Sequence, residues 1–148
     1  MRLVRLVYVS RMTPECDTLA LQEILEVSRR KNEDRDITGV LCYDPRFFMQ
    51  CLEGPRAAVN ELYADIVHDS RHKDVTLLEY CDVRERQFAD WSMAFLKAAD
   101  LDQETLRKHA VGERFDPYAL GAEQARDFLV EVVEQERERL AGQVSTRG

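Results

Sequence analysis

Residues 36–53, DITGVLCYDPRFFMQCLE, are the part of the sequence that decides the fold. Two apolar runs lie in this stretch, at 36–43 and 47–53, and the short polar segment DPR at 44–46 separates them. Runs of this length that contain β-branched and aromatic residues and end at turn residues are typical of strands. A short connection with a proline favours a hairpin between them. The stretch therefore predicts two antiparallel strands.

The pattern on both sides of this hairpin alternates between strand and helix. Apolar residues follow each other closely in the expected strands and recur at helical spacing in the expected helices. Outward from the hairpin, we expect strands at 2–9, 75–83 and 92–97, and helices at 18–31 and from Pro55 to about residue 70. This order, β-α-β-β-α-β with one more strand, predicts an α+β, ferredoxin-like sheet with two helices on one face. Such a fold hosts many functions and identifies none by itself.

The last third of the chain has a helical pattern. A short amphipathic segment covers 102–111, and a longer helix is expected to start near the Asp-Pro pair at 116–117. These C-terminal helices are expected to cover the other face of the sheet. We therefore expect a first domain at 1–98, a helical extension packed on its sheet at 99–141, and a disordered tail at 142–148.

Composition limits the classes of function. The 148 residues fit one domain, and 45% hydrophobic with 33% charged residues is typical of a globular protein. A formal net charge of −7 disfavours binding to nucleic acid or to anionic membranes. Apolar runs are too short for a membrane-spanning helix, and the charged N-terminus does not resemble a signal peptide. We expect a cytoplasmic protein that binds neither nucleic acid nor membrane.

Cysteine and histidine spacing gives little sign of a metal site. The four cysteines lack CxxC spacing, which favours free thiols that are mostly buried: Cys16, Cys42, Cys51 and Cys81. His68 and His72 lie four residues apart, a spacing that could place both on one helix face as metal ligands. No third ligand stands at a matching distance, so we interpret them as polar residues at a helix C-terminus and expect no metal. His109 has no evident partner.

Polar residues at positions expected in the core are the stronger signal. Gln50 alternates with Phe48 and Leu52 on one strand face, so an amide lies between two large apolar neighbours. A buried amide needs partners, which could be a tyrosine hydroxyl or a bound heterocycle. Asn32, near the end of the first helix, is a second such amide or, alternatively, a helix C-cap. From spacing alone, a structural Tyr–Gln pair and a ligand site both remain open.

Several separated motifs resemble one family. They are LVYVS with Tyr8, ITGVLCYD, FFMQCLEGP with Gln50, DSRH at 69–72, and F-x-x-W-S-M with Trp91 and Met93, while Asn32 precedes ITG. In this order, from Leu3 to about Lys97, the chain resembles the BLUF family, the sensors of blue light using FAD.

The resemblance implies a non-covalent flavin between the two helices and the sheet. It implies that Asn32 bonds the polar edge of the ring and that Gln50 bridges the ring and Tyr8. The other residues it implies at the flavin are Ile24, Ser28, Lys31, Ile66, Arg71 and His72. Because the motifs address the shared ring, FAD is expected but FMN and riboflavin remain open.

The resemblance also implies how light becomes a signal. Excitation leads to electron and proton transfer from Tyr8, and Gln50 then rearranges its hydrogen bonds by rotation or tautomerism. The resulting red-shifted state is relayed through the fifth strand, with Trp91 and Met93, to the C-terminal helices. We expect Met93 to contact Gln50, and leave open which of Trp91 and Met93 faces the flavin.

Three classes of function are compatible with the sequence. A blue-light photoreceptor that is not an enzyme and acts on a separate partner protein, with self-association of the chain, fits best. The alternatives are a flavin-dependent redox enzyme and a flavin-free regulatory or binding module with the same fold. Signatures for nucleotide, serine-hydrolase or zinc chemistry are absent from the sequence.

Overall fold

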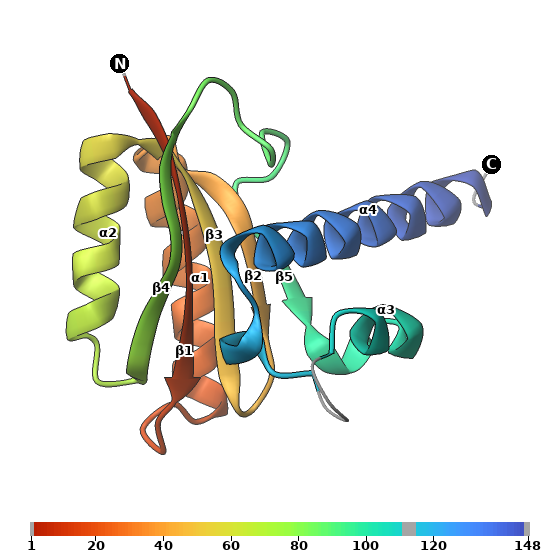
Figure 1. Cartoon of the computed structure of the whole chain (residues 1–148), viewed down its shortest axis with the longest axis horizontal. Coiled ribbons are helices and arrows are strands. Elements are labelled where there is room, and N and C mark those ends of the chain that lie inside the picture. Colours follow the sequence, from red (N-terminus) through yellow and green to blue (C-terminus); the bar gives the residue numbers. More distant parts are fainter. Residues whose placement is uncertain (1, 111–114, 147–148) are drawn as a thin grey trace.

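The computed structural model describes residues 2–110 and 115–146 and has the expected alternation of strands and helices (Figure 1). Strands and α-helices run in the order β1 (Leu3–Met12), α1 (Thr18–Asp34), β2 (Thr38–Tyr43), β3 (Phe47–Pro55), α2 (Arg56–His68), β4 (His72–Val83), β5 (Ala94–Lys97), α3 (Gln103–Lys108) and α4 (Ala122–Thr146). Two 3-10 turns, η1 (Ala98–Asp100) and η2 (Pro117–Ala119), lie before α3 and α4.

The five strands form one mixed sheet in the order β4-β1-β3-β2-β5. β1 pairs antiparallel with β3 and β4, and β2 pairs antiparallel with β3 across the predicted hairpin. The added strand β5 lies parallel to β2. A Cβ at Gly39 would overlap the carbonyl oxygen of Cys51, so the close β2–β3 pairing requires glycine in the ITG motif. The ferredoxin-like α+β prediction is confirmed.

Strand parity sorts the side chains into two cores, one on each face of the sheet. On β3, Phe48 and Leu52 face α1 and α2, whereas Phe47, Met49 and Cys51 face the other side. Helix α4 covers that other side, where Phe128, Leu129 and Val132 are buried against the sheet. Figure 1 shows α1 behind the strands, α2 beside β4 at the left, and α4 crossing in front of the sheet. The expected covering of both faces is therefore present.

The long C-terminal helix starts later and ends later than predicted. The Asp116 side chain caps the 3-10 turn η2 by accepting from Tyr118 N, and α4 itself begins only at Ala122, after Gly121. Helix α4 then continues to Thr146, so the tail expected to be disordered is helical as far as that residue. Residue 111, the predicted end of the short helix, lies outside the described residues, and α3 ends at Lys108.

The four cysteines are free, with Cys42 and Cys51 buried and Cys16 and Cys81 partly buried. Within residues 2–110 and 115–146, no helix is long and apolar enough to cross a membrane.

Candidate functional site

A cavity of about 260 Å³ lies between α1, α2 and the sheet face that they cover. Eight of the predicted site residues line it: Tyr8, Ile24, Ser28, Lys31, Gln50, Ile66, Arg71 and His72. The other lining residues, which the sequence analysis did not assign to the flavin, are Glu23, Val27, Leu41, Phe48, Leu62, Asp65 and Asp69. The apolar members follow from the same helix and strand faces, and Asp69 opens the DSRH motif.

A chain of buried polar contacts forms one wall of the cavity. Tyr8 and Gln50 are directly opposite each other on β1 and β3, and the Tyr8 hydroxyl donates to Gln50 Oε1 at 2.6 Å. Gln50 Nε2 donates to Met93 Sδ at 3.5 Å. Tyr8 and Gln50 are almost fully buried. Both ends of the Gln50 amide are therefore used, and Met93 makes the contact that we predicted for it.

Burial sets the ionisation of the tyrosine. Desolvation, followed by the nearby Tyr63 and Asp69, raises the pKa of Tyr8 far above its ordinary value. The phenol therefore keeps its proton at neutral pH and acts as a hydrogen-bond donor. A phenol that donates fits the observed orientation of Gln50, in which Oε1 faces Tyr8 and Nε2 faces Met93.

Asn32 differs from Gln50 because its amide has no protein partner. It is fully buried in the last turn of α1, and neither Oδ1 nor Nδ2 has a hydrogen-bond partner among the described residues. The α1 C-cap is Arg35, so Asn32 does not cap the helix. An unpaired buried amide is costly, and in native proteins it calls for a specific explanation such as a ligand.

The two histidines of the predicted i, i+4 pair do not share a helix face. His68 ends α2, where its Nδ1 bonds Ala64 O, and His72 begins β4 after the chain has left the helix. His72 is buried and its Nδ1 lies 2.8 Å from Ser10 Oγ. Burial lowers the pKa of His72 to about 4, so the ring is neutral at pH 7. No group of metal-ligating side chains occurs in the described parts of the chain.

Among the charged groups that line the cavity, Arg71 and Asp69 pair with each other. Arg71 donates to both oxygens of Asp69, at 2.7 Å from Nη2 and 2.9 Å from Nε. This pairing lowers the pKa of Asp69. Arg35, at the end of α1, lies 3.8 Å from Asp65.

His109, whose partner the sequence did not reveal, bonds Glu131 on α4 at 2.7 Å and does not line the cavity.

Trp91 and Met93 lie on opposite sides of the sheet and not on β5. Both precede β5, which begins at Ala94, so the predicted fifth strand started too early. Met93 is buried in the core under α1 and α2, next to Gln50, whereas Trp91 packs against the core under α4. The Trp91 carbonyl accepts from Gly39 N at 3.1 Å. The buried Nε1 of Trp91 has no hydrogen-bond partner within the described residues.

These features define a binding pocket for a flat heterocycle with polar edges. Apolar side chains of α1 and α2 form its sides, and the Gln50 amide supplies an oriented donor and acceptor. Asn32, the ninth predicted site residue, is not among the described residues that line the cavity, although its buried amide lies unpaired in the last turn of α1. The comparison with protein families matches residues 3–94 to BLUF, "Sensors of blue-light using FAD". The chain belongs to this family of flavin-based blue-light sensors.

Individual relatives agree with this assignment. The beta subunit of a photoactivated adenylate cyclase from Euglena longa is 37% identical over 92 residues, and the blue light- and temperature-regulated antirepressor BluF from Escherichia coli K12 is 32% identical over 80 residues. Among solved structures, BlsA in its photo-activated state has a TM-score of 0.77 at 31% identity, covering 87% of this chain and 93% of BlsA. BlrB, a BLUF protein in its dark state, has a TM-score of 0.75 at 29% identity. The match covers 91% of this chain and 97% of BlrB.

The curated relatives are much longer than the matched region. The matched residues make up 62% of this chain but 11% of the Euglena longa protein, and 54% of this chain but 20% of the Escherichia coli antirepressor. The similarity to these two proteins therefore concerns a sensor domain and not their whole length.

Proposed function

We propose that this chain is a blue-light photoreceptor that binds FAD in the cavity between α1 and α2. The observation that carries the proposal is the pair of buried amides, Gln50 shared between Tyr8 and Met93 and Asn32 without a protein partner among the described residues. A bound flavin supplies absorption of blue light and, once excited, a strong oxidant. The cavity volume is near the lower end for small-molecule pockets, about 300 Å³, which suits a ring system with the remainder of the cofactor outside.

The residues around the cavity divide into those that hold the ring and those that respond. Asn32 would offer an acceptor and two donors to the ring's polar edge, and its burial would keep water from competing for these bonds. Ser28 and Lys31 border the cavity on α1, and Ile24 and Ile66 form apolar walls. Arg71 and His72 lie at the α2–β4 connection, where they would meet the outer part of the cofactor.

The response belongs to Tyr8 and Gln50. Tyr8 would give an electron and its phenolic proton to an excited flavin and take both back, and Gln50 would exchange the roles of its amide ends. Before the exchange, Oε1 accepts from Tyr8 and Nε2 donates to Met93. An exchange would turn a donor toward Tyr8 and leave the Met93 sulfur facing an oxygen, which cannot donate to it. The exchange therefore changes both contacts of Gln50, and the contact with Met93 loses its donor.

The signal leaves through the segment that carries Met93. This segment continues into β5, whose Ala94 and Leu96 lie in the core beneath α4. We propose that displacement of Met93 moves Trp91 and β5 relative to α4, and that α3 and α4 present the result to a separate partner protein or a second copy of the chain. In this proposal the chain is a sensor without catalytic activity that works in the cytoplasm.

The variant Gln50→Leu tests the proposal, with Gln22→Leu on the exposed side of α1 as the matched control. We expect both variants to purify yellow, because Asn32 remains. Gln50→Leu should lose the red shift after a blue flash, whereas Gln22→Leu should keep it. A normal red shift in Gln50→Leu would refute the role of Gln50. A flavin absorption that bleaches steadily when an electron donor is added, with conversion of that donor to an oxidised product, would instead favour a flavin-dependent redox enzyme.

A further inference from the structure

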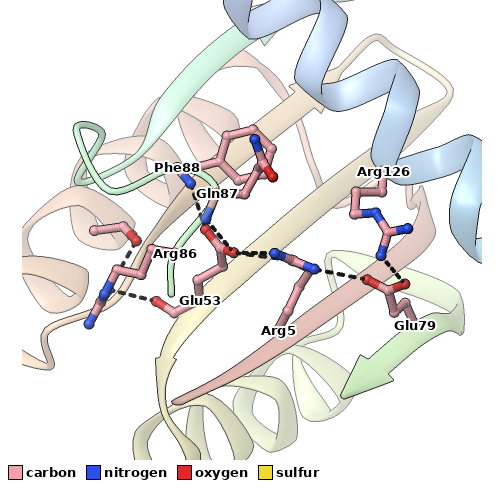
Figure 2. Close-up of polar contacts among 8 residues, drawn as sticks. Arg5, Glu53, Glu79, Arg86, Gln87, Phe88 and Arg126 are labelled. Carbon is pink, nitrogen blue, oxygen red and sulfur yellow. Dashed lines mark hydrogen bonds and ion pairs between the residues drawn. The ribbon is translucent and has the colours of Figure 1, made fainter. Parts of the chain in front are cut away.

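The side of the sheet that faces α4 contains a buried ion pair. Glu53 on β3 is fully buried, and Arg5 lies directly opposite it on β1. Arg5 donates to Glu53 Oε2 at 3.1 Å from Nε and 3.0 Å from Nη2 (Figure 2). Buried ion pairs contribute little net stability because both charges lose their hydration. The Arg5–Glu53 pair therefore calls for an explanation other than its contribution to net stability.

Glu53 also fastens the segment between β4 and β5, residues 84–93. Its two carboxylate oxygens accept from the backbone N–H groups of Gln87, at 2.9 Å, and Phe88, at 2.7 Å. Arg86 adds a second attachment, since its guanidinium donates to the Glu53 carbonyl at 3.0 Å and to Thr38 Oγ1 at 2.9 Å. Figure 2 shows these contacts converging on Glu53. The start of the segment is thus fixed to the end of β3.

The network continues from Glu53 to α4. Arg5 Nη1 lies 3.8 Å from Glu79 Oε1 on β4, and Arg126 of α4 donates to Glu79 Oε2 at 3.1 Å (Figure 2). Charges alternate along the series Glu53, Arg5, Glu79 and Arg126, so each inner group has an opposite charge on both sides. A shift of Glu53 or Arg5 therefore changes the attraction felt by the next group, as far as α4.

Strand β3 holds both ends of residues 84–93, from opposite faces of the sheet. Gln50 contacts Met93 on the face under α1 and α2, and Glu53 binds Gln87 and Phe88 on the face under α4. We propose that Glu53 is a positioning residue for signal output: it fixes the segment that Met93 moves, and couples it through Arg5, Glu79 and Arg126 to α4. This inference rests on the proposed function, because it needs light to change the Gln50–Met93 contact.

Three light-minus-dark measurements on the full-length, flavin-loaded protein follow the signal separately at the cavity, at residues 84–93 and at α4. The flavin red shift reports the cavity. Fluorescence of Trp91, the one tryptophan of the sequence, reports the segment. Hydrogen exchange of α4 backbone amides reports the helix. A purely structural role for the network would change dark-state stability but not the relation among these three light-induced differences.

Variants along the network should interrupt the steps at different points. Arg126→Gln and Glu79→Gln should keep the red shift and the Trp91 difference but reduce the light-induced exchange difference in α4 about fivefold or more. Arg126→Lys, which keeps the charge opposite Glu79, should restore part of it. Glu53→Gln should reduce the Trp91 difference as well. If Glu53→Gln does not fold, the Arg126 and Glu79 variants still decide the matter.

The matched control is the exposed pair Arg137–Asp90, which joins the same segment to the same helix at 3.4 Å. Exposed ion pairs have weak effects, so Arg137→Gln should leave all three differences unchanged. An undiminished α4 difference in both Arg126→Gln and Glu79→Gln would overturn the inference, as would an equal loss in Arg137→Gln. Absence of the red shift in the wild-type protein would instead overturn the proposed function, and this inference with it.

Discussion

Two buried amides in one core, Gln50 and Asn32, have opposite surroundings. Gln50 bonds Tyr8 and Met93, and the protein can therefore bury it at little cost. Asn32 is equally buried, but no bond to either of its side-chain polar atoms occurs within the described residues. In the proposed function, a bound flavin would supply the donor and the acceptor that compensate this cost. Single-residue changes can separate these two roles.

Asn32→Leu should have opposite effects on flavin binding and on stability. Leucine is similar in size and removes the unpaired amide, so the flavin-free protein should become more stable by about 1 kcal/mol. Flavin affinity should fall roughly tenfold or more because the ring loses its hydrogen bonds. Urea unfolding of the flavin-free protein and flavin titration measure the two effects. A destabilised protein with unchanged affinity would show that Asn32 is structural.

His72 should make stability depend on pH. Its folded-state pKa of about 4 lies below the value of about 6.5 for an exposed histidine, so the unfolded chain binds more protons between these values. Stability contributed by neutral His72 is therefore complete above pH 6.5 and lost as the pH falls toward 4. Between pH 7 and 5 the loss should be about 2 kcal/mol. Urea unfolding of the flavin-free protein at both pH values measures it.

The control for this dependence is His72→Gln, which has no titratable group at the same buried position. Its loss of stability between pH 7 and 5 should be smaller than that of the unchanged chain by the same amount. Equal losses in both proteins would show that His72 is not the group responsible.

Strand parity made the residues of the helix-covered core predictable. Tyr8 and Gln50 follow from alternation with apolar neighbours, and that pattern left open whether they bound each other or a ligand. The same parity places Glu53 on the buried face with Met49 and Cys51, but its partner Arg5 lies on another strand. Ser10 was missed in the same way, because its bond to His72 joins residues 62 positions apart. Such pairings depend on strand register, which a single sequence does not specify.

At the scale of elements, α4 serves as the second cover of the sheet. Its early turns bury Phe128 and Leu129 against β1, β2 and β3, whereas Leu140, further along the helix, is 39% exposed. Figure 1 shows the C-terminal part of α4 extending beyond β5. The helix therefore has one part anchored on the sheet and one part that extends beyond the edge of the sheet (Figure 1).

Phe128→Ala should destabilise the protein by about 3–5 kcal/mol, because it removes a fully buried ring between α4 and the sheet. Leu140→Ala on the same helix should change the free energy of unfolding by less than about 0.5 kcal/mol. Chemical denaturation of both variants measures the difference. Similar values for the two would contradict the packing of α4 on the sheet.

Element order was predictable, whereas several boundaries were not. Periodicity and the DPR turn were sufficient for the hairpin and for α1 and α2. The Asp116–Pro117 signal marks a real helical start, but the chain forms one 3-10 turn there and begins α4 only after Gly121. β5 starts later than its apolar run suggested, because its bounds depend on pairing with β2. Boundaries that are set by partner elements are not encoded locally.

At the scale of the whole molecule, one sheet separates the cavity from the face that α4 covers. The cavity lies under α1 and α2, α4 lies on the opposite face, and residues 84–93 contact both sides. A change at Gln50 thus has a short physical path to α4. The TM-scores and coverages of BlsA and BlrB show that the overall fold recurs in chains of similar length.

The most direct test is the absorption spectrum of the protein purified in the dark, recorded before and after a blue flash. The proposed function predicts a flavin spectrum that shifts slightly to the red and returns in darkness, because Gln50 changes its hydrogen bonds while the flavin ends chemically unchanged. A flavin that stays fixed or bleaches would contradict it, as would a protein that binds no flavin even when FAD is added.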